Sequence, residues 1–305
     1  MTLRLADHCG LFLADEAERD PRIWVLDGDL ADSDGAVHFE RRHPERFVMA
    51  GIAEQAMVSM AAGMASCGLR PFVFSFAAFL AYRAYDQVRV GLSQAGMPVT
   101  LVGSHGGGCA SRNGKTHAAI NDLAAMASLP RLEVWAPAGP REVRHACREI
   151  LAGDQPAYLR LPRRPLDDLP GEPAPARWLE PRRPVSLAGC GLGTHLAAAA
   201  HRRLAAEGHA LGLLHVARPK PLPEDLGATL GGVDTLFVIE DHYGFGGLGS
   251  LLQQLDLPLR VVPLGWPAEW AGKSGADDDL LALGGLDAET LARRIRPALA
   301  RRRTG

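Results

Sequence analysis

The chain has 305 residues, with 33 Lys and Arg against 35 Asp and Glu and a formal net charge of −2. This balance argues against a general nucleic-acid binder, which carries a basic excess. No apolar run is long enough to cross a membrane and no signal-type segment opens the sequence, so we expect a cytoplasmic protein. The five cysteines are scattered without a C-x-x-C spacing, so we expect neither a disulfide framework nor a metal site built on this chain.

The first part of the sequence alternates short apolar runs with helical patterns. Strands are predicted at residues 23–26, 46–49, 71–75, 99–103, 132–135 and 157–161, and helices at 54–67 and from the third strand to about 93. Strands that alternate with helices at this spacing predict βαβ units and a mostly parallel sheet.

Prolines are concentrated between Pro162 and Pro184, where no helix or central strand can continue. The second part then repeats the α/β pattern, with strands predicted at 185–188, 211–216, 235–239 and 259–264 and helices at 193–207, 249–255 and 288–299. We therefore predict two doubly wound α/β domains, 1–165 and 185–305, joined by a Pro-rich linker at 166–184.

Glu54 is the first candidate site residue, because the segment 51–55 follows a predicted strand and opens a helix. Sites in open α/β sheets form at the carboxyl ends of strands. A first-turn glutamate stabilised by the helix dipole is the competing interpretation. Phe76, Phe79 and Tyr82 recur every three residues and would share one side of a helix, either as core or as a ring pocket. Methionines 57, 60 and 64 are interpreted as core packing.

A glycine-rich loop follows the fourth predicted strand, with His105 at its start and Arg112, Lys115 and His117 further along. It lacks the spacing of a P-loop. Its composition suggests a polar, flexible loop that faces an anion or a carbonyl group, although either histidine could be structural. The segment 244–249 matches G-x-G-x-x-G, but no acidic residue ends the next strand, so we interpret it as turn geometry.

Together these motifs resemble the C-terminal half of transketolase over nearly the whole chain. The matching segments are G-I-A-E-Q at 51–55, the F-A-x-F…R-A-x-D-Q-x-R run at 76–89, His105 with G-x-T-H at 114–117, N-D-L-A at 121–124, E-D-H at 240–242 with G-G-L-G at 246–249, and K-S-G at 273–275 with G-L-D-A-E at 285–289. The resemblance implies a pyrimidine-binding transketolase-type domain followed by a transketolase C-terminal domain.

The resemblance also implies a thiamine-diphosphate-dependent transfer of a two-carbon ketol unit. Glu54 would hydrogen-bond N1′ of the aminopyrimidine and favour the imino tautomer that removes the C2 proton. Phe76, Phe79 and Tyr82 would pack against the aminopyrimidine ring, and Asp29 would also contact the cofactor. The residues expected to act on the substrate are the catalytic His105 and His117, then Asn113, Ser33 and a phosphate-binding Arg163, with Arg160 as the competing arginine.

Two departures from the family pattern refine this expectation. The G-D-G…N-N signature of the N-terminal half, which binds diphosphate and Mg²⁺, is absent. We therefore expect one subunit of a split enzyme, inactive without an N-terminal subunit and assembled as a heterotetramer with two copies of each chain. In the substrate loop, Arg112, Asn113 and Lys115 replace two acids and a proline, which suggests a specialised ketol or acyl transfer.

Three alternatives remain open from the sequence. The first is the β subunit of a 2-oxoacid dehydrogenase, which shares the glutamate and the R-A-x-D-Q run. The second is an acyl transfer similar to that of 1-deoxyxylulose-5-phosphate synthase. The third is a regulatory or scaffolding partner that kept the fold without activity.

Overall fold

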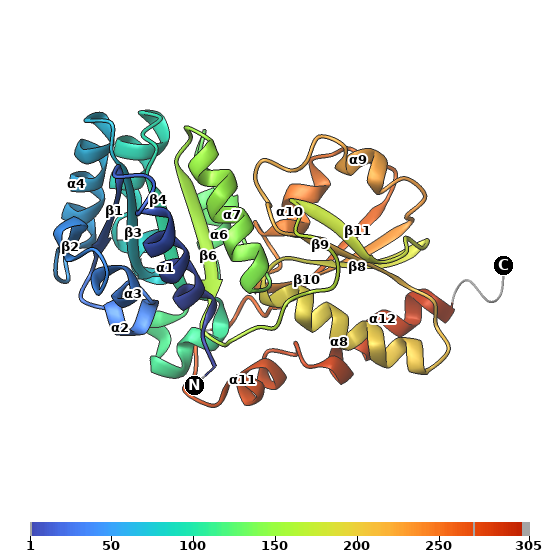
Figure 1. The fold of residues 1–305 in the computed structure, drawn as a ribbon. Coiled ribbons are helices and arrows are strands. Elements are labelled where there is room, and N and C mark those ends of the chain that lie inside the picture. Colours follow the sequence, from blue (N-terminus) through green and yellow to red (C-terminus); the bar gives the residue numbers. More distant parts are fainter. Residues whose placement is uncertain (1, 271, 301–305) are drawn as a thin grey trace.

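The computed structural model describes residues 2–270 and 272–300, without the side chains of Ser111, Arg112 and Ala300. The chain forms two lobes, each built around one β-sheet (Figure 1). The first sheet has the order β2-β1-β3-β4-β6-β5 and the second β11-β10-β8-β9-β7. All paired strands are parallel except β7, which runs antiparallel to β9 at the edge of the second sheet. The predicted fold class is confirmed.

The strands are β1 (Ile23–Asp27), β2 (Phe47–Met49), β3 (Arg70–Phe76), β4 (Thr100–Gly106), β5 (Glu133–Trp135), β6 (Ala157–Pro162), β7 (Ala176–Glu180), β8 (Val185–Gly189), β9 (Gly212–Val216), β10 (Thr235–Tyr243) and β11 (Arg260–Trp266). The α-helices are α1 (Leu5–Glu16), α2 (Ala31–Asp34), α3 (Val37–Glu40), α4 (Glu54–Ser66), α5 (Tyr85–Gln87), α6 (Asp122–Ala127), α7 (Pro140–Ala152), α8 (Leu192–Ala206), α9 (Leu226–Thr229), α10 (Leu248–Gln253), α11 (Asp277–Leu283) and α12 (Ala288–Ala300). Short 3₁₀ turns are η1 (Pro44–Arg46), η4 (Gly108–Asn113) and η5 (Lys115–His117), while η2 (Phe79–Arg83) and η3 (Val88–Gln94) are π-helical.

The sheets are covered on both faces, which explains why their strands are continuous apolar runs. On β3, Phe72 and Phe74 enter the core layer that contains α1 and α7, whereas Val73 enters the opposite layer with α4 and η3. Each core layer continues from the first lobe into the second. The lobes are also joined through backbone hydrogen bonds, because the N–H of Val134 donates to the carbonyl of Lys220 at 2.8 Å.

Two local predictions need correction. The single long helix expected up to about residue 93 is instead two π-helical segments separated by α5. The proline-rich segment 166–184 is not wholly a linker, because it contains β7. Proline is tolerated beside an edge strand, where one side of the ladder is unpaired. The domain boundaries themselves stay a prediction. Among the described residues, no helix has the length and apolar character needed to cross a membrane.

Candidate active site

Most of the predicted site residues follow the carboxyl ends of neighbouring parallel strands. Asp29 comes after β1, Glu54 after β2, His105 lies at the end of β4 and Arg163 follows β6. The sheet order reverses at β1, which lies between β2 and β3. Ligands of open α/β sheets bind outside the carboxyl ends at such a reversal. The topology therefore brings these residues to one edge of the first sheet.

Glu54 opens α4 and is almost completely buried, with 1% of its surface exposed. Arg83 Nη1 donates to both of its carboxylate oxygens, at 2.8 and 2.7 Å. Ser75 Oγ lies 3.5 Å from Oε1. Arg83 also lies over the Phe79 ring, 4.3 Å from its centroid, in cation–π geometry. The site thus holds a buried carboxylate whose partner is a half-exposed arginine side chain from η2.

Aromatic rings and two histidines gather beside this carboxylate. Phe76 and Phe79 stack with centroids 5.6 Å apart. The Phe76 ring lies 4.1 Å from that of His105, and the His117 ring is edge-on to Phe76 at 5.8 Å and to Phe79 at 5.3 Å. The structure therefore brings together four of the residues predicted from sequence.

His105 combines unusual backbone geometry with an altered charge state. Its φ of 57° is in the left-handed region, which is uncommon for a residue other than glycine and frequent at functional sites. Burial lowers its pKa to about 3, and the positive charges of Arg163, Arg4 and His117 act in the same direction. His105 is therefore a neutral imidazole near neutral pH, able to accept or donate one hydrogen bond.

Tyr82 lies differently from the other two predicted rings. Its hydroxyl donates to Asn121 Oδ1 and accepts the Asn121 backbone N–H at 3.3 Å. Phe76 ends strand β3, and only Phe79 and Tyr82 lie in η2, which is π-helical with more residues per turn than an α-helix. The expectation that Phe76, Phe79 and Tyr82 share one helical face is therefore wrong.

The rim next to β1 carries Asp29 and Ser33. Asp29 is exposed and has a φ of 70°, so it is a second residue in the left-handed region at this edge of the sheet. The Ser33 backbone carbonyl accepts a hydrogen bond from Arg4, and the Asp32 carbonyl accepts another at 2.8 Å. Arg4 thus fixes the α2 turn. Sequence reasoning missed Arg4, because nothing in its local pattern links it to a site.

The first part of the glycine-rich loop is buried, whereas its composition suggested a polar segment throughout. Gly106, Gly107 and Gly108 are buried. A Cβ atom on Gly107 would lie 1.7 Å from Asp241 Oδ2, and one on Gly108 would lie 2.1 Å from the Trp266 ring. The glycines are needed because the second lobe presses against this loop. Further along, Asn113 and Lys115 are exposed and Thr116 Oγ1 lies 3.0 Å from His117 Nδ1, while the side chain of Arg112 lies outside the described residues.

The two candidate arginines, one in β6 and one just after it, have different surroundings. Arg160 is buried, donates to Asp122 Oδ2 at 2.8 Å and donates to the Asp241 carbonyl at 2.7 Å. These contacts engage Arg160 inside the protein, between the two lobes. Arg163 is partly exposed and lies 3.6 Å from Asp277 Oδ1. Arg163 is therefore the arginine that remains accessible at the rim.

The G-x-G-x-x-G match in the second lobe is explained by a buried glutamate. Glu240 Oε2 and Oε1 accept the N–H groups of Leu248 and Gly249, at 2.5 and 3.0 Å. A Cβ atom on Gly247 would lie 2.0 Å from Glu240 Oε2. The glycines make room for this carboxylate at the start of α10, which agrees with the interpretation as turn geometry. Within the described residues, no group of three or more His, Cys, Asp and Glu is placed to hold a metal ion.

Comparison with known proteins agrees with this geometry. The family described as the transketolase pyrimidine-binding domain matches residues 2–167. The 6-deoxy-6-sulfo-D-fructose transketolase subunit SqwH of Clostridium sp. (strain MSTE9) is 33% identical over 295 residues, which cover 92% of this chain and 90% of that protein. The 1-deoxy-D-xylulose-5-phosphate synthase of Anaeromyxobacter sp. (strain Fw109-5) is 34% identical over 307 residues, but the match covers only 48% of its length.

Among solved structures, a split-gene transketolase described as an inactive β4 tetramer superposes with a TM-score of 0.88 at 29% identity. The match covers 98% of this chain and 99% of that chain. The fold, the order of the motifs and these relatives agree. The chain belongs to the transketolase family, whose cofactor is thiamine diphosphate, and it is a transferase subunit that corresponds to the C-terminal part of a split transketolase.

Proposed function

We propose that this chain supplies the pyrimidine-binding half of a thiamine-diphosphate-dependent transketolase and is active only with a separate N-terminal subunit. The observation that carries the proposal is the buried Glu54 carboxylate beside the stacked rings of Phe76 and Phe79. In this proposal the N-terminal subunit holds the diphosphate and Mg²⁺, and two copies of each chain form the complex.

The residues fit an aminopyrimidine, a flat aromatic ring with polar nitrogens on its edge. Stacked phenyl rings provide a flat apolar wall, and offset or edge contacts between such rings are favourable. Beside this wall, both oxygens of the Glu54 carboxylate accept charge-assisted hydrogen bonds from Arg83. Glu54 would hold the proton at N1′, and Phe79 would orient the ring. Thiamine diphosphate, when bound, supplies the electron sink for the two-carbon unit.

An exposed face of α4 supports the need for a partner. Its members carry no charge and lie on one side of the helix: Gln55, Ala56, Ser59, Met60 and Gly63. Met60 is 45% exposed and Ile52, just before the helix, is 74% exposed. The interpretation of Met60 as core packing is therefore wrong. A contiguous uncharged face of this kind is typical of a protein interface, and it adjoins Glu54.

The histidines and cations suggest how a substrate would be held. Neutral His105 and the nearby His117 would hydrogen-bond hydroxyl and carbonyl groups of the donor, and would move protons at these oxygens. Asp29, Ser33 and Asn113 line the rim where a sugar hydroxyl would bind. Arg163 would bind the anionic end of the donor, because a planar guanidinium suits such oxyanions.

The substrate we favour is a ketose that carries a sulfonate or phosphate group. The relative named as a 6-deoxy-6-sulfo-D-fructose transketolase subunit matches along nine-tenths of its length, which supports a specialised ketol transfer. The match to 1-deoxy-D-xylulose-5-phosphate synthase gives a second candidate, acyl transfer from a 2-oxoacid. Supplying a ketose donor and pyruvate to the complex in parallel separates the two candidates, because each reaction consumes only one of them.

Calorimetric titration of thiamine diphosphate with Mg²⁺ tests the proposal. We expect no binding to this chain alone, binding to the complex with an N-terminal subunit, and weaker binding in Glu54→Gln. Glu149→Gln, an exposed glutamate on α7, is the matched control and should bind like wild type. Tight binding by the isolated chain would contradict the division of the site between two subunits.

A further inference from the structure

The second lobe reaches the rim of the candidate active site through α11. This helix packs against η4, the turn that leads to Asn113 and His117. The thiol of Cys109, in η4, lies 3.8 Å from the carbonyl oxygen of Asp277. Figure 1 shows α11 extending below the first lobe, away from the second sheet. A residue at the start of α11 can therefore act on groups of the first lobe.

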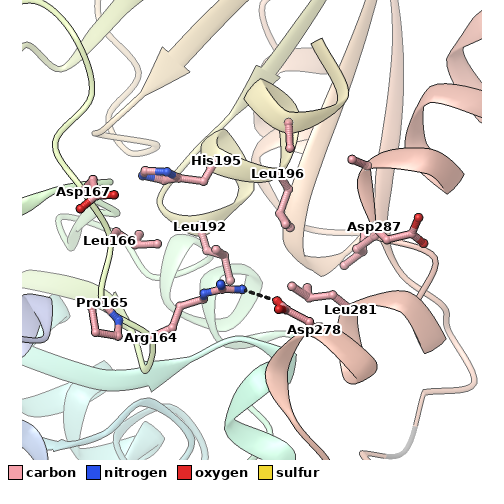
Figure 2. Close-up of a pocket in the computed structure, with 13 residues that line it drawn as sticks. Arg164, Pro165, Leu166, Asp167, Leu192, His195, Leu196, Asp278, Leu281 and Asp287 are labelled. Carbon is pink, nitrogen blue, oxygen red and sulfur yellow. Dashed lines mark hydrogen bonds and ion pairs between the residues drawn. The ribbon is translucent and has the colours of Figure 1, made fainter. Parts of the chain in front are cut away.

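Two consecutive arginines after β6 face two consecutive aspartates at the start of α11. Arg163 Nη1 lies 3.6 Å from Asp277 Oδ1, and Arg164 Nη1 donates to Asp278 Oδ1 at 3.1 Å. The charge of Arg163 acts on His105, in the candidate active site. Arg164 and Asp278 instead line a cavity of about 390 Å³ beside α8, where Figure 2 shows their ion pair. The Arg164–Asp278 pair therefore serves as an internal control for the Arg163–Asp277 pair.

The contact between Arg163 and Asp277 leaves binding capacity on both sides. Their 3.6 Å separation exceeds the usual N–H···O hydrogen-bond length. Asp277 Oδ1 is buried and has no hydrogen-bond partner among the described residues. The side chain of Arg163 is 27% exposed, and a guanidinium carries five N–H donors. Arg163 can therefore bind an external anion while Asp277 stays beside it and offsets part of its charge.

We propose that Asp277 determines specificity for the anionic end of the ketose donor, by favouring an end group with one negative charge over an end group with two. This inference rests on the proposed function. A sulfonate carries one negative charge at neutral pH, whereas a phosphate monoester carries about 1.5 to 2. Both groups suit the guanidinium, but repulsion by the Asp277 carboxylate increases with the charge of the ligand. Asp277 therefore selects against the phosphorylated donor.

Two matched variants test this role in the complex with the N-terminal subunit. Asp277→Asn and Asp278→Asn each remove one carboxylate from the first turn of α11, and each leaves one arginine without its ion pair. The value of kcat/KM is measured for the 6-sulfo and 6-phospho forms of the same ketose, with one acceptor. Asp277→Glu, which keeps the charge, is the conservative variant.

Asp277→Asn is expected to raise the ratio of phosphate to sulfonate kcat/KM by about five- to tenfold, mainly through a lower KM for the phosphorylated donor. Asp278→Asn should change this ratio by less than about twofold, because screening weakens an exposed charge. Asp277→Glu should keep the wild-type ratio. A merely structural role of α11 would lower the activity with both donors together and leave the ratio as it is.

An unchanged ratio in Asp277→Asn, or an equal shift in Asp278→Asn, would overturn the inference. Arg163→Gln gives an independent route if Asp277→Asn does not assemble, since it should raise KM for both donors. A wild-type KM in Arg163→Gln would separate the arginine from the anion and would also overturn the inference. If the wild-type complex transfers a ketol unit from neither donor, the proposed function itself fails.

Discussion

Each lobe holds a buried glutamate at the carboxyl side of its sheet, but the two glutamates are held by different kinds of donor. Glu240 accepts hydrogen bonds from the backbone N–H groups of Leu248 and Gly249. Glu54 accepts both of its close hydrogen bonds from the side chain of Arg83, which is 43% exposed. Backbone donors at a helix start are fixed by the fold, whereas a half-exposed side chain can move when a ligand binds. Of the two glutamates, only Glu54 can therefore exchange its hydrogen-bond partner for a ligand.

The surroundings of the two glutamates differ in the same way. Next to Glu240, Asp241 and His242 join the lobes: Asp241 Oδ1 accepts the Gly108 N–H at 2.9 Å and the Trp266 indole N–H at 2.7 Å, and His242 Nε2 accepts the Ala124 N–H at 3.2 Å. Next to Glu54 lie the stacked rings of Phe76 and Phe79 and the uncharged α4 face. A motif therefore indicates a functional site only where its polar groups have partners that a ligand can replace.

Removing the Arg160 side chain from between the lobes should have the largest effect on stability. Arg160→Ala leaves Asp122 buried without its charged partner, which is expected to lower the free energy of unfolding by about 3–5 kcal/mol. Urea denaturation measures the change. Arg141→Ala is the control, because Arg141 pairs with the exposed Glu172 and should cost less than about 1 kcal/mol. A similar small cost for Arg160→Ala would show that the contact between the lobes is not held by this pair.

Removing the Glu54 carboxylate should affect activity rather than stability. Glu54→Gln is expected to lower ketol transfer by the assembled complex by about 100-fold or more, as for loss of a group that handles a proton. The melting temperature should stay close to that of wild type, because Arg83 can turn to solvent. Initial rates at saturating thiamine diphosphate provide the measurement, with Glu149→Gln as control. Retention of more than about a tenth of the activity would remove Glu54 from the reaction.

The free energy of unfolding should depend on pH through Glu240. Burial raises the pKa of Glu240 to about 7 from its ordinary 4.5, although the Gly249 and Leu248 N–H groups oppose this. A raised pKa in the folded state means that the stabilisation is full below pH 4.5 and is lost as pH rises through 7. Glu240→Gln should therefore gain on the order of 3 kcal/mol relative to wild type over this range.

Denaturation curves at several pH values check this expectation. The variant and wild type share the neighbouring Asp241, whose pKa burial raises to about 6, and His242, whose pKa burial lowers to about 4. Taking the difference between the two proteins cancels these shared contributions. A difference that does not change with pH would mean that Glu240 is ionised in the fold at no cost.

The smallest effect is expected from substitution of Arg83, the partner of Glu54. Arg83→Met should lower ketol transfer by about tenfold, since the Glu54 carboxylate loses the charged donor that holds it in position. Stability should fall by less than in Arg160→Ala, because the Arg83 side chain is 43% exposed whereas Arg160 is buried. Arg89→Met is the control, because Arg89 lies in η3 and pairs with the exposed Asp86. An effect as large as that of Glu54→Gln would mean that Arg83 itself contacts the cofactor or substrate.

Much of the fold was predictable from sequence because it depends on local patterns. Continuous apolar runs located the strands of both sheets except β7, which was taken as part of the linker. Strand β10 is longer than predicted because its polar end, Glu240 to Tyr243, lies between the lobes. The positions of Glu54 and His105 after strands placed both residues at one edge of a parallel sheet. The family motifs also identified Phe76, Phe79 and His117, which the structure places in contact with one another.

Other features were decided only by tertiary structure. The pairing of Arg83 with Glu54, the contact of Arg160 with Asp122 and the approach of α11 to η4 join residues far apart in the chain, which no local spacing encodes. Composition suggested a flexible glycine loop, but the glycines are there because Asp241 and Trp266 leave no space for a Cβ atom. The sequence by itself thus determined the elements and the family, since both follow from neighbouring residues. The tertiary structure decided which polar groups are enclosed and which stay available, because that depends on what the second lobe covers.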